Sequence, residues 1–112
     1  MYDSDTKAGL KERGYRYEFE YGDYGWNWQI VEVYSKDGRV FTLGDAGCSC
    51  SYFGEYWSSI DVVEGELHEV ADVPLLSDLG DYDETAESIQ NDYRELFRRL
   101  REERNGGSFL TF

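Results

Sequence analysis

The most regular stretch of the sequence is Tyr15-Arg16-Tyr17-Glu18-Phe19-Glu20-Tyr21. Aromatic and charged side chains alternate along it without a break. In an extended chain successive side chains point to opposite faces, so the four aromatic rings would share one face and the three charges the other. The stretch therefore predicts a β-strand with one buried and one solvated face.

Two more strands are predicted directly after it. The turn Gly22-Asp23-Tyr24-Gly25 leads into an apolar run over residues 26–35, which alternates less regularly and so indicates a strand covered on both faces. Asp37-Gly38 supplies the positive backbone angle of a tight hairpin turn, and residues 39–43 form the third strand. Three sequential strands with short turns predict an antiparallel meander.

The middle of the chain carries weaker signals. Small residues and glycines over residues 44–54 predict a loop or an irregular strand extension. Residues 59–63 and 67–70 each predict a further short strand. Pro74 suits the first turn of a short helix over residues 75–79.

A C-terminal helix is predicted for residues 83–104. Its apolar residues recur at intervals of three and four and form one stripe: Ala86, Ile89, Tyr93, Leu96 and Leu100. Acidic residues near the start and arginines near the end complement the helix dipole. The stripe favours packing against the sheet over a coiled-coil seam, because the run is short. The sequence Asn105-Gly106-Gly107 predicts the end of the helix.

These elements predict one α+β domain over residues 1–112, a usual length for a single domain. Residues 1–14 are a lead-in with a short helix. Residues 15–70 form an antiparallel meander of three to five strands, and the helix at residues 83–104 packs against it. The apolar tail at residues 105–112 is expected to join a sheet edge or the core, and a docking peptide is the alternative.

The net charge of −13 is concentrated in one central segment. Between Arg39 and Arg94 there are thirteen Asp and Glu residues and no Lys or Arg, whereas acids and bases balance in the rest of the chain. Direct binding to nucleic acid is disfavoured, because phosphate contacts need Lys and Arg. The segment favours a protein partner with a basic surface. The alternative is that the charge serves solubility alone.

Aromatic residues accompany these acids in the stretch Tyr52-Phe53-Gly54-Glu55-Tyr56-Trp57, and a second cluster is Trp26-Asn27-Trp28. In a small domain such rings usually pack in the core. Exposed Tyr or Trp beside carboxylates would instead act as anchors for a partner. The residues expected to contact the partner are Asp45, Glu55, Tyr56, Trp57, Asp61, Glu64, Glu66 and Glu69.

Cys48-Ser49-Cys50 is the most conspicuous short motif. The motif could be half of a metal site, and the candidate ligands are Cys48, Cys50 and His68. Structural zinc needs four ligands, however, and the chain has no second cysteine pair. We therefore expect no metal and no other cofactor. A disulfide between such close residues would be strained, so the motif is interpreted as a tight backbone passage between glycines.

The sequence shows no set of residues for catalysis. Its sole histidine, His68, lies in the acidic run Glu66-Leu67-His68-Glu69, where nearby carboxylates favour the charged imidazole over a catalytic base. No glycine-rich phosphate loop followed by lysine is present. We expect a binding protein without catalytic residues.

Residues 44–50, Gly44-Asp45-Ala46-Gly47-Cys48-Ser49-Cys50, and the following Tyr52-Phe53-Gly54-Glu55 resemble a family of small uncharacterised proteins from phages and prophages of actinobacteria. Members have aromatic strands before an Asp-small-Gly-Cys-Ser-Cys motif and acidic, helix-forming residues after it. The resemblance covers roughly residues 26–70. It implies expression in a bacterial host cell and, by analogy, a host protein as the partner.

No run approaches the roughly 20 apolar residues of a membrane helix, and residues 1–5 lack the basic and apolar regions of a secretory signal. We therefore expect a cytoplasmic protein without a membrane partner. The leading hypothesis is an acidic phage-type protein that binds a basic site on a host or phage protein, as a nucleic-acid mimic or as an inhibitor of a host or defence factor. The alternatives are a metal-stabilised module that uses the cysteines and a self-associating minor virion component.

Overall fold

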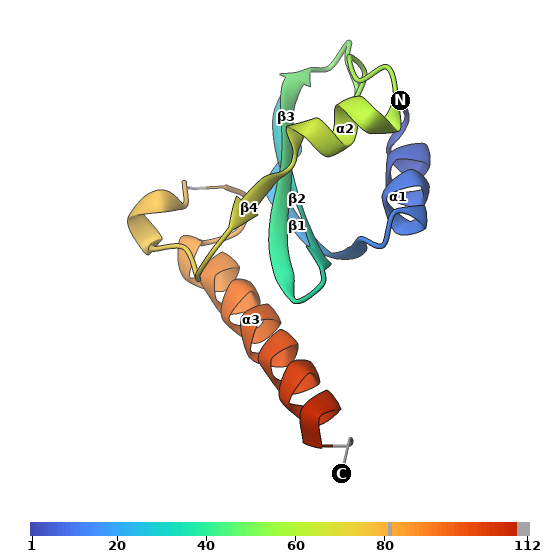
Figure 1. Ribbon diagram of the computed structural model, residues 1–112. Coiled ribbons are helices and arrows are strands. Elements are labelled where there is room, and N and C mark those ends of the chain that lie inside the picture. The colour runs from blue at the N-terminus through green and yellow to red at the C-terminus, as the bar shows by residue number, and fades with distance from the viewer. Residues whose placement is uncertain (81, 110–112) are drawn as a thin grey trace.

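The computed structural model describes residues 1–80 and 82–109 (Figure 1). Its elements, in chain order, are α1 (Asp3–Glu12), β1 (Arg16–Asp23), β2 (Asn27–Lys36), β3 (Arg39–Cys48), α2 (Ile60–Glu66), β4 (His68–Val70), the 3-10 turn η1 (Leu76–Asp78) and α3 (Ala86–Phe109). The strands form one antiparallel sheet in the order β1-β2-β3-β4. The predicted α+β fold, with a meander and a C-terminal helix, is confirmed.

Helices cover both faces of this sheet. Helices α1 and α2 lie on one face and α3 lies on the other (Figure 1). Two separate hydrophobic cores result. The core under α1 and α2, here the α1 core, contains Leu10, Tyr15, Tyr34, Leu43, Phe53, Trp57 and Val63. The core under α3, here the α3 core, contains Tyr21, Val33, Val40, Leu79, Ile89, Tyr93, Leu96 and Leu100.

Strand β2 contributes to both cores, which confirms the prediction of a strand covered on both faces. Val33 is fully buried in the α3 core, and its neighbour Tyr34, with 1% of its surface exposed, is buried in the α1 core. Successive residues of a strand point to opposite faces, so a doubly covered strand reads as a nearly continuous apolar run. The irregular pattern of residues 26–35 has this cause.

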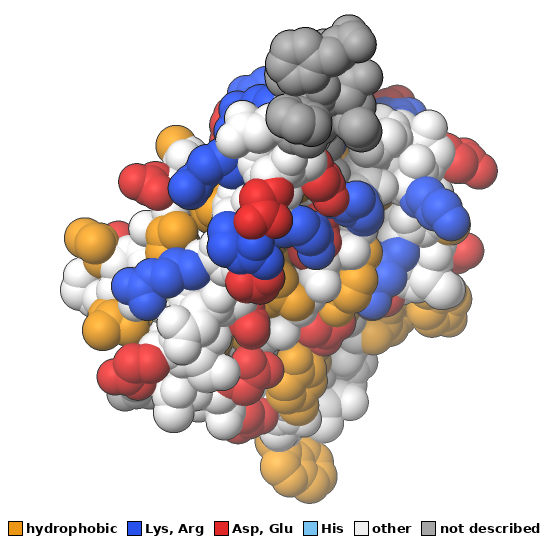
Figure 2. All heavy atoms as spheres, turned by 90° about the horizontal axis from the view of Figure 1, so that it is seen from below, with side chains coloured by type: hydrophobic (Ala, Val, Ile, Leu, Met, Phe, Trp, Pro, Cys, Tyr) orange, Lys and Arg blue, Asp and Glu red, His pale blue; other side chains and the backbone are white. Residues whose placement is uncertain are grey.

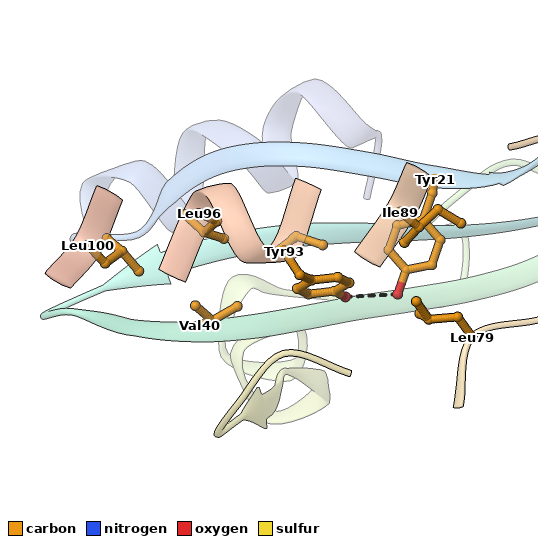
Figure 3. Close-up of a cluster of buried hydrophobic side chains, with 8 residues drawn as sticks. Tyr21, Val40, Leu79, Ile89, Tyr93, Leu96 and Leu100 are labelled. Atoms are coloured by element: carbon orange, nitrogen blue, oxygen red, sulfur yellow. Dashed lines mark hydrogen bonds between the residues drawn. The ribbon is translucent and has the colours of Figure 1, made fainter. Parts of the chain in front are cut away.

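The apolar stripe of α3 packs on the sheet (Figure 3). Ile89, Tyr93 and Leu96 are each at most 3% exposed. The hydroxyl groups of Tyr93 and Tyr21 are 2.8 Å apart and share a hydrogen bond inside the core, which satisfies both buried oxygens. The stripe is therefore core packing within one chain and not a coiled-coil seam.

The prediction that the four rings of residues 15–21 share one face is wrong. Tyr15 packs in the α1 core, but Phe19 and Tyr21 pack in the α3 core. The cause is a β-bulge in β1. Tyr17 pairs with Tyr34 and Phe19 with Val33, so Glu18 is an extra residue without a partner in the ladder. One extra residue reverses the face to which every later side chain points.

The side chain of Glu18 is only 6% exposed, and cationic and hydroxyl groups surround it. It accepts hydrogen bonds from Ser35 on β2, from Arg99 on α3 and from Arg16 on β1. Burial alone would raise the pKa of Glu18, but these three hydrogen bonds lower it below its ordinary value. The bulge thus ties α3 to the sheet through a buried carboxylate.

Residues 59–63 form no strand, contrary to the prediction, because α2 begins there. The Ser59 hydroxyl accepts a hydrogen bond from the backbone N–H of Val62, a helix N-cap, and Asp61 lies in the first turn. The cap outweighs the strand preference of Val62-Val63. The second predicted short strand is confirmed as β4, and the helix expected after Pro74 is the single turn η1.

Helix α3 also differs from the prediction at both ends. It begins at Ala86, where the Thr85 hydroxyl accepts a hydrogen bond from the N–H of Ser88. It runs through Asn105-Gly106-Gly107 to Phe109, so the predicted stop is wrong. Glycine inside a helix costs about 1 kcal/mol relative to alanine but does not end it. Of the predicted tail, residues 110–112 lie outside the described residues.

A buried carboxyl group lies between α1 and β2. Glu32 is 1% exposed and accepts a hydrogen bond of 2.6 Å from the Tyr34 hydroxyl. Lys7 of α1 lies 3.7 Å from it, and Asp3 is beside it, with one buried oxygen that has no hydrogen-bond partner among the described residues. Burial raises the pKa of Glu32 to about 8, and the neighbouring Asp3 adds to the shift against the opposing effects of Tyr34 and Lys7.

The substitution Glu32→Gln should make the free energy of unfolding less dependent on pH. The pKa of Glu32 is about 8 in the folded chain and 4.5 for an ordinary Glu side chain, so between these values the folded state holds a proton that the unfolded state releases. Stability therefore falls as pH rises through this window, by at most about 1.4 kcal/mol per pH unit. Glutamine does not titrate, so at pH 8 the variant should have a higher free energy of unfolding than the wild-type chain. Urea unfolding across the window measures the difference.

Glu12→Gln is the matched control, because Glu12 is an exposed carboxylate on α1, the helix that covers Glu32. It should leave the pH dependence of the wild-type chain unchanged. The same pH dependence in Glu32→Gln and in the wild type would contradict the assignment of a protonated, buried Glu32.

Candidate functional site

The turn between β1 and β2 and the loop after β3 lie at the same end of the sheet. Asn27, the first residue of β2, pairs with Cys48, the last residue of β3. Tyr24 and Trp26 of the turn line a shallow hollow together with Ser49 of the loop. We call the residues 24–26 and 48–56 the aromatic end.

The aromatic end exposes several large rings to solvent. Trp26 is 81% exposed and Tyr56 is 83% exposed, while Tyr24 and Tyr52 are about half exposed or slightly less. Tyr2 stacks on Tyr52 with 4.8 Å between the ring centroids. Single exposed rings are normal on a protein surface, but a group of them at one end is typical of a surface that contacts a partner.

The loop that carries Tyr56 is held in place by core and polar contacts. The indole N–H of Trp28 donates to the carbonyl of Cys48 at 2.9 Å. The carboxylate of Asp45 accepts a hydrogen bond of 2.9 Å from the N–H of Gly54, whose φ of +82° favours glycine. A loop fixed at both places presents Tyr56 without a large loss of conformational entropy on binding.

The predicted contact residues divide into four groups. Glu55 and Tyr56 lie at the aromatic end, and Tyr56 is exposed as expected. Trp57 is 9% exposed, because it packs on Phe53 in the α1 core with 5.2 Å between ring centroids, so it is no surface anchor. Asp45 holds the loop.

The remaining predicted contacts lie on α2 and β4. Arg13 lies 2.7 Å from Asp61 and 2.9 Å from Glu64, and Arg39 pairs with Glu69, so three of these carboxylates are neutralised. Glu66 is exposed near the end of α2. The structure thus does not gather all the predicted acids on one surface.

Most acids of the base-free segment nevertheless lack a cation. Within the described residues, the following have no Lys or Arg nitrogen within 4.0 Å: Asp45, Glu55, Glu66, Asp72, Asp78, Asp83, Glu84, Glu87 and Asp92. Every Lys and Arg of the chain lies in or beside α1, at the start of β1, beside the β2–β3 turn, or in α3. The aromatic end contains none of them.

Two acids outside the predicted set reach the aromatic end. The segment before α3 returns to the β1–β2 turn, where Asp83 accepts a hydrogen bond of 3.1 Å from the backbone N–H of Tyr24. Burial raises the pKa of Tyr24 to about 12, and the nearby carboxylates of Glu20, Glu84 and Asp83 add to the shift. The turn therefore lies in a negative electrostatic environment.

Trp26 and Tyr24 are absent from the predicted contact residues, although Trp26 was named as part of an aromatic cluster. A signal was present, because Gly25-Trp26 follows a predicted turn and a ring at a turn tip has little structure around it to bury it. The approach of residues 83–84 to this turn carried no local signal, because it is a contact between segments about sixty residues apart.

The three candidate metal ligands do not form one site. Cys48 and Cys50 are neighbours at the aromatic end, but His68 pairs with Thr42, six residues earlier on β3 than Cys48. Six residues of strand span about 20 Å. In the part of the chain that the structure describes, no group of three His, Cys, Asp or Glu side chains is placed to hold a metal ion. No described helix is long and apolar enough to cross a membrane.

The neighbours Tyr56 and Trp57 should differ sharply in their contribution to stability. Trp57→Ala removes a core ring and is expected to cost about 3–5 kcal/mol of unfolding free energy. Tyr56→Ala removes an exposed ring and should change it by no more than about 0.5 kcal/mol. Urea unfolding of both variants tests this, and equal losses would contradict the burial of one ring and the exposure of the other.

Comparison with protein-family models, with curated proteins and with solved structures found no match for this chain. The resemblance to actinobacterial phage proteins therefore stays a prediction.

Proposed function

We propose that this protein is a binding protein, not an enzyme, and that its aromatic end binds a basic surface on another protein. The observation that carries the proposal is the coincidence of two features at one end of the sheet. Trp26 and Tyr56 are each more than 80% exposed there, and Glu55 and Asp83, at or beside the same end, have no Lys or Arg nitrogen within 4.0 Å among the described residues. Aromatic anchors at an end that also carries negative charge match a partner that is basic and partly apolar.

The distribution of basic residues supports binding through the aromatic end. Seen from below, the end of the molecule opposite the aromatic end carries a band of Lys and Arg side chains (Figure 2). Several cations of the chain pair with carboxylates, as Arg16 does with Glu18 and Arg98 with Glu95. The molecule is thus acidic and aromatic at one end and mixed in charge at the other. Such a charge asymmetry orients a protein as it approaches a basic partner.

Nucleic-acid mimicry is a more specific form of the same proposal. Carboxylates would take the place of phosphates on a nuclease, a defence complex or a DNA-binding regulator, and the partner would come from the bacterial host or from a phage. The acids that have no cation nearby support it, because no Lys or Arg lies among them in the sequence between Arg39 and Arg94. The exposed rings would supply the apolar part of the contact.

Capture from an actinobacterial lysate tests the proposal. The immobilised wild-type chain should retain a basic protein at about 50 mM salt and lose most of it at about 500 mM, because salt screens contacts between exposed charges. The double variant Trp26→Ala/Tyr56→Ala should retain at least about tenfold less at low salt, since anchors of this kind dominate binding. Quantitative mass spectrometry of the bound fraction measures both effects.

The matched control is Leu75→Ala/Leu76→Ala, which removes two exposed apolar side chains near η1, outside the aromatic end. It should retain the partner as the wild type does. Capture that depends neither on salt nor on Trp26 and Tyr56 would contradict the proposal and favour a charge that serves solubility alone.

A further inference from the structure

The two cysteines are exposed, form no disulfide with each other, and have their sulfur atoms in contact. Cys48 ends β3 and Cys50 follows two residues later. Their Sγ atoms are 2.6 Å apart, whereas a disulfide bond measures about 2.0 Å. A bond between the two sulfur atoms would therefore need little movement of the backbone.

The turn that brings the thiols together is held by its neighbours. The N–H of Ser51 donates to the carbonyl of Cys48 at 3.0 Å, and the N–H of Cys48 donates to the Ser51 hydroxyl at 3.0 Å. A Cβ atom on Gly47 would overlap the Ser51 hydroxyl and lie 2.6 Å from the Trp28 ring. The residue before Cys48 must therefore be glycine for this turn to form.

The two thiols differ in their acidity. The hydrogen bond from Cys50 lowers the pKa of Cys48, and the Ser51 hydroxyl adds to this effect. The same contact raises the pKa of Cys50, because a thiolate at Cys48 lies beside it. Thiolates are the reactive form of cysteine, so Cys48 is the attacking sulfur and Cys50 is the resolving thiol.

We propose that Cys48 and Cys50 form a reversible dithiol–disulfide couple that reacts with low-molecular-weight disulfides. The Cys48 thiolate attacks one sulfur of the disulfide, whose S–S bond breaks and releases one small thiolate. Cys50 then loses its proton and attacks the Cys48 sulfur of the mixed disulfide, which releases the second small thiolate. Two protein thiols are oxidised to one disulfide, the small disulfide is reduced to two thiols, and both protons pass to the released thiolates.

The ring that closes contains only the three residues 48–50, and such a short ring is strained. The sequence alone made this strain an argument against a disulfide. A reversible couple needs a disulfide that is easily reduced, and strained, exposed disulfides have this property. The strain of the short ring therefore favours a reversible couple. The contact of the two thiols and their exposure thus favour a regulatory or exchange role over a structural crosslink.

Glutathione redox buffers and mass spectrometry test the proposal. The reduced wild-type chain, treated with oxidised glutathione and quenched with an alkylating agent, should lose two hydrogens, take up no alkyl group, and recover both thiols after reduction. Cys50→Ser should accumulate a mixed disulfide with one glutathione. Cys48→Ser should likewise accumulate a mixed disulfide at Cys50, because neither variant keeps the second thiol that would resolve it.

Both cysteines are exposed, so the two serine variants should unfold within about 0.5 kcal/mol of the wild type, and urea unfolding checks that each one is folded. Two results would overturn the proposal: a wild-type chain that ends with two bound glutathiones, or stoichiometric zinc that protects both thiols from alkylation.

Discussion

Neighbouring residues of β2 point into two different cores, Val33 toward α3 and Tyr34 toward α1. Each core needs its own covering helix, because apolar surface left in water costs roughly 25 cal/mol per Å². The bulge at Glu18 lets β1 serve both cores as well, with Tyr15 on one face and Tyr21 on the other. The three-layer arrangement of helix, sheet and helix follows from this double covering.

The same arrangement separates the charges. Arg99 reaches Glu18 from α3, and Arg13 at the end of α1 reaches Asp61 and Glu64, so cations are drawn to the elements that close the two cores. Among the described residues, no Lys or Arg lies in the turn and loop at the aromatic end. Rings that the cores do not hold are exposed there, and Tyr24 is exposed beside carboxylates. Packing and charge thus leave one end of the sheet open, acidic and aromatic.

Local patterns predicted the meander and the stripe of α3, because periodicity and turn chemistry act over a few residues. They did not predict the bulge, since Glu18 fits a regular alternation and is extra only when paired with β2. Trp57 was expected on the surface, but the ring that it packs on, Phe53, and the α1 core bury it. The acids near Tyr24 depend on residues 83–84 returning to the β1–β2 turn, which is a tertiary contact.

The central claim is that the aromatic end is exposed and negative, and the exposed Trp26 in its turn can report on that charge. Fluorescence quenching by caesium and by iodide ions tests it, with Trp26→Phe used to subtract the signals of Trp28 and Trp57. With each ion's quenching expressed relative to its quenching of free tryptophan, the account predicts that caesium, a cation drawn toward the carboxylates, quenches the Trp26 signal more than iodide does, and that salt reduces the difference. Equal relative quenching by the two ions, or stronger relative quenching by iodide, would contradict it.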